Sequence, residues 1–303
     1  MKNKSNKMPP ISLKAIDICR PIIALNSSRT LLDARNSMLR YKISRIVVSF
    51  NGKAVGIVTE KDIANFLYDT PPAKRLSEIA LKEIVQKKLL TVNESSTIDY
   101  CCKLMLQNNI SSLIVNDDQG KDKGIITKTD IVELYAYHQP RPTPVYEWMS
   151  DKVHSVAPAE SIHMIALLMN IHKISRVVVQ RNMKPIGIVT SRDFLPLSLI
   201  HDTGSLGRYW TTRNHTTLAK KKQRFIPSGM IGIVLAQDIM TSPPITIHKN
   251  VNIAEAAKIM IRNRISGLPV INGKGHLVGI ITKTDILKMG PRKNFIKIRN
   301  EFS

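Results

Sequence analysis

Gly56-Ile57-Val58-Thr59-Glu60-Lys61-Asp62 is the stretch that decides the fold, because its pattern occurs four times in the chain. The other copies of this motif run from Gly124 to Asp130, from Gly187 to Asp193 and from Gly279 to Asp285. Each copy begins as a short apolar strand and passes through a polar turn into an apolar run, which marks a helix start. The threonine hydroxyl, the aspartate carboxylate and the first free N–H groups of that helix should therefore converge. Such a spot suits a hydroxyl-rich ligand that carries phosphate.

Each motif closes a longer repeat. The four copies share one frame, without a gap, from an apolar residue through a methionine to an Ile-Ser pair; the frame starts at Leu25, Val92, Val156 and Ile247. The spacing of Ile253, Ala257 and Met260 indicates one face of a helix. The apolar residues after each Ile-Ser pair predict a buried strand, and Asn51-Gly52 and Asn272-Gly273 are hairpin signals. Each repeat is therefore expected to run short strand, helix, strand, strand, helix.

This unit resembles the CBS domain. The fourth copy carries the hallmarks most clearly, in Asp238-Ile239-Met240-Thr241, in Ile265-Ser266-Gly267-Leu268-Pro269-Val270 and in the motif that starts at Gly279. The second copy departs from the usual pattern in its leading segment, residues 76–84. The resemblance implies an α/β (α+β) fold in which four CBS repeats pair into two Bateman modules, which can stack as a disk. The layout is similar to the γ subunit of AMP-activated protein kinase and to stand-alone archaeal and bacterial CBS proteins.

The repeats and the segments between them give the expected domain organisation. In chain order we expect a basic N-terminal tail (1–15), repeat one (16–70), repeat two (74–138), a Pro-rich linker (139–144), repeat three (145–201), a basic insertion (202–233), repeat four (235–290) and a basic C-terminal tail (291–303). The linker contains three prolines in alternation with other residues, a composition typical of a semi-rigid spacer. Neighbouring repeats are expected to pair, one with two and three with four.

The resemblance also implies site residues. In CBS pairs that bind adenosine nucleotides, the motif aspartate accepts hydrogen bonds from the ribose hydroxyls, and nearby Ser or Thr hydroxyls meet ribose or phosphate. The aspartates carried over are Asp62, Asp130, Asp193 and Asp285. The hydroxyls are Thr59, Thr127, Thr190 and Thr282, with Thr129 and Thr284 as second donors. A carboxylate suits a vicinal diol because it can accept two charge-assisted hydrogen bonds. In the alternative interpretation, each aspartate only caps its helix, a role worth about 1 kcal/mol.

Phosphate groups need cations. Arg45 and Arg176 follow the Ile-Ser pair in the odd repeats, whereas the even repeats have Ser112 and Gly267 at this position. The resemblance implies that Arg45 and Arg176 reach nucleotide phosphates, for which the planar guanidinium is well suited. Lys61 and Arg192, inside the motifs, are further candidates. Repeats one and three thus combine motif and arginine, so the four copies are not expected to be equivalent; the alternative is that these arginines are ordinary surface residues.

The chain is strongly basic. Its 45 Lys and Arg residues exceed its 23 Asp and Glu residues by 22 charges, more than a small anionic ligand requires. Nucleic acid is therefore a second candidate partner. The insertion interleaves basic residues with Tyr209, Trp210 and Phe225, a composition that suits phosphate contact and base stacking. Its basic residues are Arg208, Arg213, Lys220, Lys221, Lys222 and Arg224. The alternative is a structured loop with solvated lysines.

Several function classes find no support in the sequence. It contains no HExxH, P-loop or GxGxxG motif and no convincing Ser/His/Asp arrangement, so we expect neither catalysis nor a required cofactor. The histidines have no ligand spacing, and the three cysteines form no CxxC pair, so we expect no metal site. No apolar window is long enough to span a membrane, and we expect a cytoplasmic protein.

Three functional hypotheses follow. The first is a non-enzymatic regulator that binds AMP, ADP or ATP in its CBS clefts and signals to an effector protein. The second is a basic nucleic-acid-binding protein in which the CBS modules are a scaffold or a ligand switch. The third is a structural or interaction protein with empty pockets. The sequence leaves open which nucleotide binds, which pockets are filled, and whether the chain is a monomeric disk or a homodimer.

Overall fold

The computed structural model describes residues 13–66, 75–85, 89–138, 142–196 and 234–289. They form four small sheets of three strands each, in which the first two strands are parallel and the last two antiparallel. Repeat one contains β1 (Ala24–Asn26), α2 (Leu31–Tyr41), β2 (Arg45–Phe50), β3 (Lys53–Thr59) and α3 (Glu60–Phe66). Repeat two contains β4 (Thr91–Asn93), α5 (Ile98–Gln107), β5 (Ser112–Asn116), β6 (Asp122–Thr127) and α6 (Lys128–His138).

Repeats three and four follow the same order. Repeat three contains β7 (Ser155–Val156), α7 (Ile162–Ile171), β8 (Arg176–Arg181), β9 (Lys184–Thr190) and the 3₁₀ helix η3 (Ser191–Phe194). Repeat four contains β10 (Ile247–His248), α10 (Ile253–Arg262), β11 (Gly267–Ile271), β12 (Leu277–Thr282) and α11 (Lys283–Met289). The mixed α/β fold predicted from the four-fold repeat is confirmed. The first helix of each repeat begins at a side-chain cap, as its local sequence requires; the caps are Thr30, Thr97, Ser161 and Asn252.

The two hairpin signals have different outcomes. Asn51 and Gly52 form the two-residue turn between β2 and β3, and both have positive φ, as a tight hairpin turn demands. In repeat four, Asn272-Gly273 does not form such a turn, because a longer loop joins β11 to β12. The positive φ there falls on Gly275, and the Asn272 side chain accepts hydrogen bonds from two backbone N–H groups of the loop. The extra loop residues remove the need for a tight turn.

Each repeat is completed by a leading segment that packs on its neighbour. These segments contain α1 (Ala15–Ile18), η1 (Leu76–Glu78) with α4 (Leu81–Ile84), η2 (Val145–Glu147) and α9 (Ala236–Ile239). The segment before repeat one bridges to β6 of repeat two, and the segment before repeat two bridges to Thr30 of repeat one. Repeats three and four exchange their segments in the same way, through Ser150–Ile280 and Thr241–Ile188 bridges. This reciprocal exchange defines module one (repeats one and two) and module two (repeats three and four).

The exchanged segments explain the motif glycines. A Cβ atom on Gly124 would lie 2.7 Å from Cys19 Sγ and 2.9 Å from the Arg20 carbonyl oxygen. A Cβ on Gly279 would lie 2.6 Å from Met149 Sδ and 2.9 Å from the Ser150 carbonyl oxygen. In all four repeats the segment from the partner repeat crosses directly over the motif glycine. The motif therefore begins with glycine because the neighbouring backbone or side chain occupies the space of a Cβ.

The Gly124→Ala variant is expected to lower the free energy of unfolding by about 1–3 kcal/mol, because the Arg20 backbone must move to admit the methyl group. Urea unfolding followed by circular dichroism measures this change. Gly273→Ala is the matched control, since no atom lies within 4 Å of its added Cβ. The control should change stability by no more than about 0.5 kcal/mol. Equal stabilities for the two variants would contradict the close approach at Gly124.

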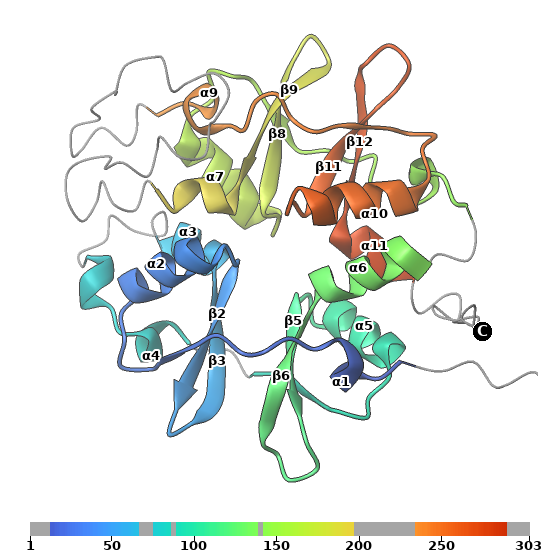
Figure 1. Ribbon diagram of the computed structural model, residues 1–303. Coiled ribbons are helices and arrows are strands. Elements are labelled where there is room, and N and C mark those ends of the chain that lie inside the picture. The colour runs from blue at the N-terminus through green and yellow to red at the C-terminus, as the bar shows by residue number, and fades with distance from the viewer. Residues whose placement is uncertain (1–12, 67–74, 86–88, 139–141, 197–233, 290–303) are drawn as a thin grey trace, which may run out of the picture.

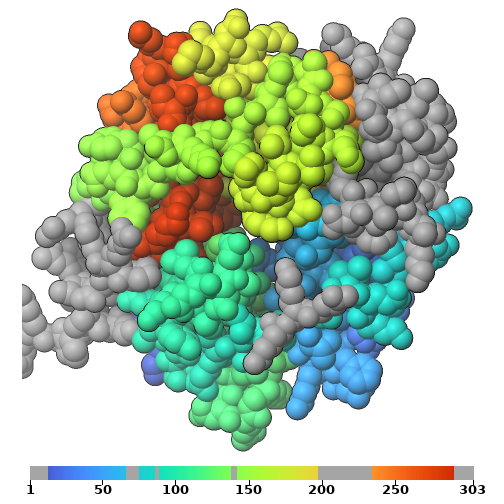
Figure 2. Space-filling view, turned by 180° about the vertical axis from the view of Figure 1, so that it is seen from behind, coloured from blue at the N-terminus to red at the C-terminus, as the bar shows by residue number. Residues whose placement is uncertain are grey.

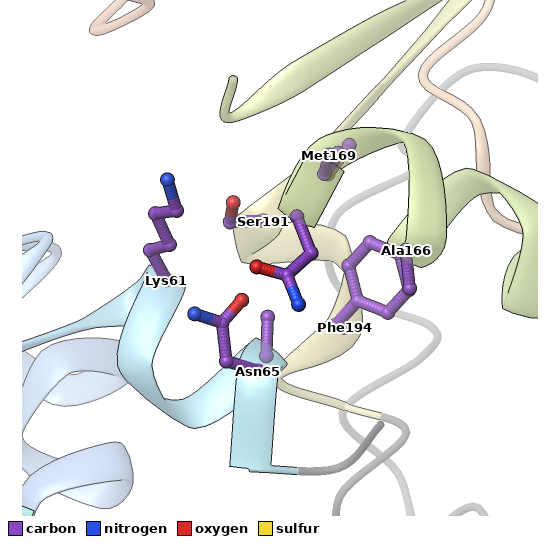
Figure 3. Close-up of a pocket in the computed structure, with 8 residues that line it drawn as sticks. Lys61, Asn65, Ala166, Met169, Ser191 and Phe194 are labelled. Carbon is purple, nitrogen blue, oxygen red and sulfur yellow. The ribbon is translucent and has the colours of Figure 1, made fainter. Parts of the chain in front are cut away.

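The two modules stack so that repeat one faces repeat three and repeat two faces repeat four, which places the four repeats around a common centre (Figure 1). Helix α6 packs against α10 and α11, and one apolar core contains buried residues of both repeats two and four. On the other side, α3 packs against α7 and η3. Figure 3 shows Lys61 and Asn65 of α3 on one side of a small pocket and Ala166, Met169 and Phe194 on the other. The predicted disk of two modules is confirmed.

Within the part of the chain that the structure describes, no helix combines the length and the apolar composition that crossing a membrane would require.

Candidate functional site

The four motifs share one local geometry. In each, one oxygen of the aspartate, Oδ2, accepts hydrogen bonds from the backbone N and the hydroxyl of the motif threonine. In repeat two, Asp130 Oδ2 lies 2.8 Å from Thr127 N and 2.6 Å from Thr127 Oγ1. The capping role is therefore present in every copy. It occupies one carboxylate oxygen and leaves Oδ1 as the principal acceptor for other partners.

Among the described residues, the second carboxylate oxygen has cationic partners in repeats two and four. Arg20 Nε lies 3.3 Å from Asp130 Oδ1, and Lys288 Nζ lies 2.8 Å from Asp285 Oδ1. Both aspartates are buried, whereas both cations are more than half exposed. A ligand hydroxyl can therefore replace an exposed cation at the Oδ1 atom without leaving that cation buried.

The two arginines after the Ile-Ser pair cross to the other repeat of their module. Arg45 Nη1 lies 2.5 Å from the Ser111 carbonyl oxygen, and Arg176 Nη1 lies 2.6 Å from that of Ser266. A Cβ on Gly267 would lie 2.2 Å from Arg176 Nη1. Repeat four has glycine in place of the arginine because Arg176 of repeat three fills the space of a side chain there. Burial of the guanidinium lowers the pKa of Arg45 and lowers that of Arg176 to about 10.

Two lysines join the modules at the centre of the disk. Lys128 Nζ donates to Thr284 Oγ1 at 2.9 Å, and Lys283 Nζ donates to Thr129 Oγ1 at 2.9 Å. Thr129 and Thr284, expected as ligand donors, thus accept hydrogen bonds from the opposite module. Desolvation, and then the charges of Arg45 and Arg176, lowers the pKa of each lysine to about 8. Sequence reasoning missed both lysines, although each directly follows a motif threonine.

Arg192 connects the modules on their other side. Its Nε lies 2.7 Å from Glu60 Oε1, and its Nη2 donates to the Ile43 carbonyl oxygen at 3.2 Å. Both partners belong to repeat one, whereas Arg192 belongs to repeat three. The ion pair is largely buried, with side-chain exposures of 15% for Arg192 and 13% for Glu60. Arg192 therefore has a structural role across the interface between the modules.

A cavity of about 380 Å³ lies where these groups meet. Its volume falls in the range of small-molecule pockets, roughly 300–1,000 Å³. Repeat two contributes Thr127, Thr129 and Asp130, and repeat one contributes Arg45. The cations at its wall come from repeats one, three and four: Arg20, Lys42, Arg45, Arg192, Arg264 and Lys283. Asp130 is the one carboxylate among the residues that line it.

The cavity groups an arginine with the motif of a different repeat from the one that the sequence suggested. Arg45 shares it with Asp130 of repeat two and not with Asp62 of its own repeat. The expectation that repeats one and three each combine their own motif with their own arginine is therefore wrong for Arg45, because this side chain crosses its module. The predicted residues that do not line this cavity are Thr59, Lys61, Asp62, Arg176, Thr190, Asp193, Thr282, Thr284 and Asp285.

Sequence reasoning also missed Lys42 and Arg264, which line the cavity from repeats one and four. Each directly precedes an Ile-Ser pair and has a positive φ, of 55° for Lys42 and 53° for Arg264. Asn109 occupies the equivalent position in repeat two, where asparagine tolerates this backbone well. A basic residue in a position that favours Gly or Asn was the signal that could have identified both.

Two further expectations from the sequence concern nucleic acid and metal ions. The basic insertion residues Arg208, Arg213, Lys220, Lys221, Lys222 and Arg224 lie outside the described residues, so nucleic-acid binding stays a prediction. Within the described ranges, no group of three or more His, Cys, Asp and Glu side chains could hold a metal ion.

Comparison with known proteins identifies the family of this chain. The model of the family described as CBS domain matches residues 13–69, 81–137, 145–199 and 236–291. Protein MJ1225 of Methanocaldococcus jannaschii, which is uncharacterized, is 26% identical over 282 residues, 89% of this chain and 95% of its own. An L-aspartate semialdehyde sulfurtransferase of the same organism is 43% identical over 82 residues, only 16% of its length. A CBS match therefore occurs also within a longer enzyme.

Two solved structures share the fold over about nine tenths of the chain. The crystal structure of MJ1225, described as a candidate archaeal homologue of g-AMPK, has a TM-score of 0.77 at 23% identity. A conserved uncharacterized protein from Pyrococcus horikoshii has a TM-score of 0.59 at 20% identity. Each match covers 91% of this chain and 99% of the other chain. At these identities the likeness concerns the fold alone.

Proposed function

Because the chain belongs to the CBS-domain family, we propose that the cavity of module one binds an adenine nucleotide and that the protein is a regulator. The observation that carries this proposal is the convergence of cations from three repeats on a cavity whose one carboxylate comes from the fourth, repeat two. Asp130 Oδ1 accepts from the ribose hydroxyls, with Thr127 beside it. Ile23, Val47 and Ile125 line the same cavity and offer an apolar surface to the base. The phosphates lie toward Arg45, Lys283 and Arg192.

The charge of the cavity favours phosphorylated ligands. Arg20 pairs with Asp130 and Arg192 pairs with Glu60, and four further cations face the single carboxylate of the cavity: Lys42, Arg45, Arg264 and Lys283. ADP and ATP neutralise more of this charge than AMP does, and S-adenosylmethionine, whose sulfonium is positive, neutralises little of it. We therefore expect affinity to rise with the number of phosphates and to be lowest for S-adenosylmethionine.

A regulatory role follows from where the ligand would sit. The cavity is completed by Arg192 of repeat three and by Arg264 and Lys283 of repeat four. A nucleotide that touches both modules binds the closed disk better than an open one, and this difference shifts the population of the two states. An effector protein that recognises one state then reports nucleotide binding. The proposal assigns no catalytic step to the chain.

Isothermal titration calorimetry of the full chain with AMP, ADP, ATP and S-adenosylmethionine tests this function. Asp130→Asn keeps an oxygen for the helix cap but removes the charge, and we expect it to weaken ATP binding about tenfold or more. Asp62→Asn is the matched control, because Asp62 caps Thr59 in the same geometry but does not line the cavity. Equal losses in both variants would contradict the assigned site. No binding of any nucleotide would favour the interpretation as an interaction protein.

A further inference from the structure

Helix α7 carries an unusual outer surface. Met164, Leu167 and Ile171 are 42%, 43% and 62% exposed, and their spacing places them on one side of the helix. We call them the apolar stripe of α7. The opposite side of the helix is also apolar and belongs to the core of repeat three, through Ile162, Ile165, Ala166 and Met169. Figure 2 shows α7, in yellow-green, as part of the surface on the back of the molecule.

The other repeats provide an internal control for the stripe. Because the repeats share one frame without a gap, the equivalents of its three residues can be identified in each helix. They are Asp33, Asn36 and Arg40 in α2, Tyr100, Lys103 and Gln107 in α5, and Glu255, Lys258 and Arg262 in α10. Every one of these side chains carries a polar group. The fold therefore does not require apolar residues at these positions, and their presence in repeat three needs another explanation.

The charge around the stripe narrows the choice of partner. From residue 161 to residue 192 the chain has no Asp or Glu, and Lys173 is exposed directly beyond the end of α7. Glu160 and Asp193, which flank this range, are used in local hydrogen bonds. A second copy of this face would bring like charges together. The insertion 202–233 is itself strongly basic and has the single acidic residue Asp202.

We propose that the apolar stripe of α7 is a docking site for an amphipathic helix of a partner protein that carries acidic residues beside its apolar face. Apolar residues of that helix at positions i, i+3 or i+4, and i+7 pack along the stripe. Its Asp and Glu residues meet a helix that has no carboxylate between residues 162 and 171 and that ends beside the exposed Lys173. Three apolar side chains make a small contact, so the complex should be transient.

Fluorescence anisotropy with designed peptides and the full-length protein tests this inference. The probe is a labelled helical peptide of about 18 residues, long enough to cover α7, with leucines on one face and glutamates beside them. The comparison peptide has lysines in place of the glutamates. The variant Met164→Asp, Leu167→Asn, Ile171→Arg copies the residues of α2 and leaves the net charge unchanged. Asp at this position also completes a capping box with Ser161, as Asp33 does with Thr30.

We expect the acidic peptide to bind the wild type at least tenfold more tightly than it binds the triple variant. The basic peptide should bind the wild type at least tenfold more weakly than the acidic peptide does. Slower hydrogen exchange in residues 162–171 should accompany binding. No binding, or equal binding to wild type and variant, would overturn the proposal. Dimerisation of the wild type that the triple variant abolishes would instead identify a second copy as the occupant. Binding seen only after residues 202–233 are replaced by a short Gly/Ser linker would identify the insertion.

Discussion

The double variant Lys128→Met, Lys283→Met is expected to unfold less easily than the wild type and yet to bind ATP about 100-fold more weakly. Both ammonium groups are partly buried near Arg45 and Arg176, which lowers the pKa of each lysine to about 8. Without a bound anion, the repulsion and desolvation of these four cations lower the free energy of unfolding. Methionine in place of the two lysines removes their part of this penalty. The hydrogen bonds to Thr284 and Thr129 are lost as well, so the net gain at pH 7 should be about 1–3 kcal/mol.

The pH dependence of the free energy of unfolding has a defined sign. A lysine whose folded pKa is about 8 and whose unfolded pKa is about 10.4 binds fewer protons in the folded state between these values. The free energy of unfolding of the ligand-free wild type therefore rises as pH increases from about 8 to about 10.4, and the full penalty is present below pH 8. Urea unfolding at pH 7 and at about pH 10 measures this rise, which the double variant should lack.

The nucleotide has the opposite effect on the lysines. Phosphate beside Lys283 stabilises its charged form, so ATP binding near pH 8 should take up protons, and calorimetry in buffers of different ionisation enthalpy detects this uptake. The control is a second double variant, Lys103→Met, Lys121→Met, which removes the same charge from two exposed positions. The control should leave the free energy of unfolding and ATP affinity nearly unchanged. A double variant at Lys128 and Lys283 that binds ATP like the wild type would contradict the central site.

Separating the modules is expected to remove the disk that the two modules of one chain form. Residues of α6, such as Tyr135 and Ala136, share one apolar core with Ala256 and Met260 of α10. In a fragment of residues 1–141 this face of repeat two has no repeat four to cover it. Because repeats two and four have the same fold, repeat two of a second fragment can take the vacant place. We expect the fragment to form a homodimer, as symmetric self-association favours.

Analytical ultracentrifugation of fragment 1–141 measures this association, with the full chain at the same concentration as the control. Addition of fragment 142–303 should convert the homodimer into a one-to-one complex, because the native pairing of α6 with α10 and α11 is better matched. Circular dichroism during urea unfolding should show a transition that depends on fragment concentration. A fragment 1–141 that stays monomeric and unfolds cooperatively would show that module one does not need module two.

The repeated fold could be predicted from the sequence because its signals are local. The frame from Leu25 to the Ile43-Ser44 pair has the period of a helix, and the apolar residues after it have the composition of a strand. The reason for the glycine at the start of each motif was not accessible, because the atoms that exclude a Cβ at Gly124 belong to Cys19 and Arg20. That contact depends on the exchange between repeats, which no local pattern encodes.

The candidate site was predicted in part. Thr127 and Asp130 could be predicted as neighbours, because the motif holds them close together in sequence and the helix cap keeps them close in space. Their partners were not, because each comes from another repeat: Arg45 reaches repeat two, and Lys283 reaches Thr129 across the disk. A cation in one motif and its acceptor in another share no spacing, so only the tertiary structure brings them together.

The exchange of leading segments also sets the order in which the chain can finish folding as it leaves the ribosome. Gly124 is covered by residues that are made before it, whereas Gly187 must wait until Met240 has been synthesised. At about 5–20 residues per second, this wait lasts several seconds. Throughout this interval the strand edge that later pairs with Thr241 is unprotected. Repeat three is therefore the repeat whose motif glycine waits longest for its covering segment, since Gly56 waits only for Val85.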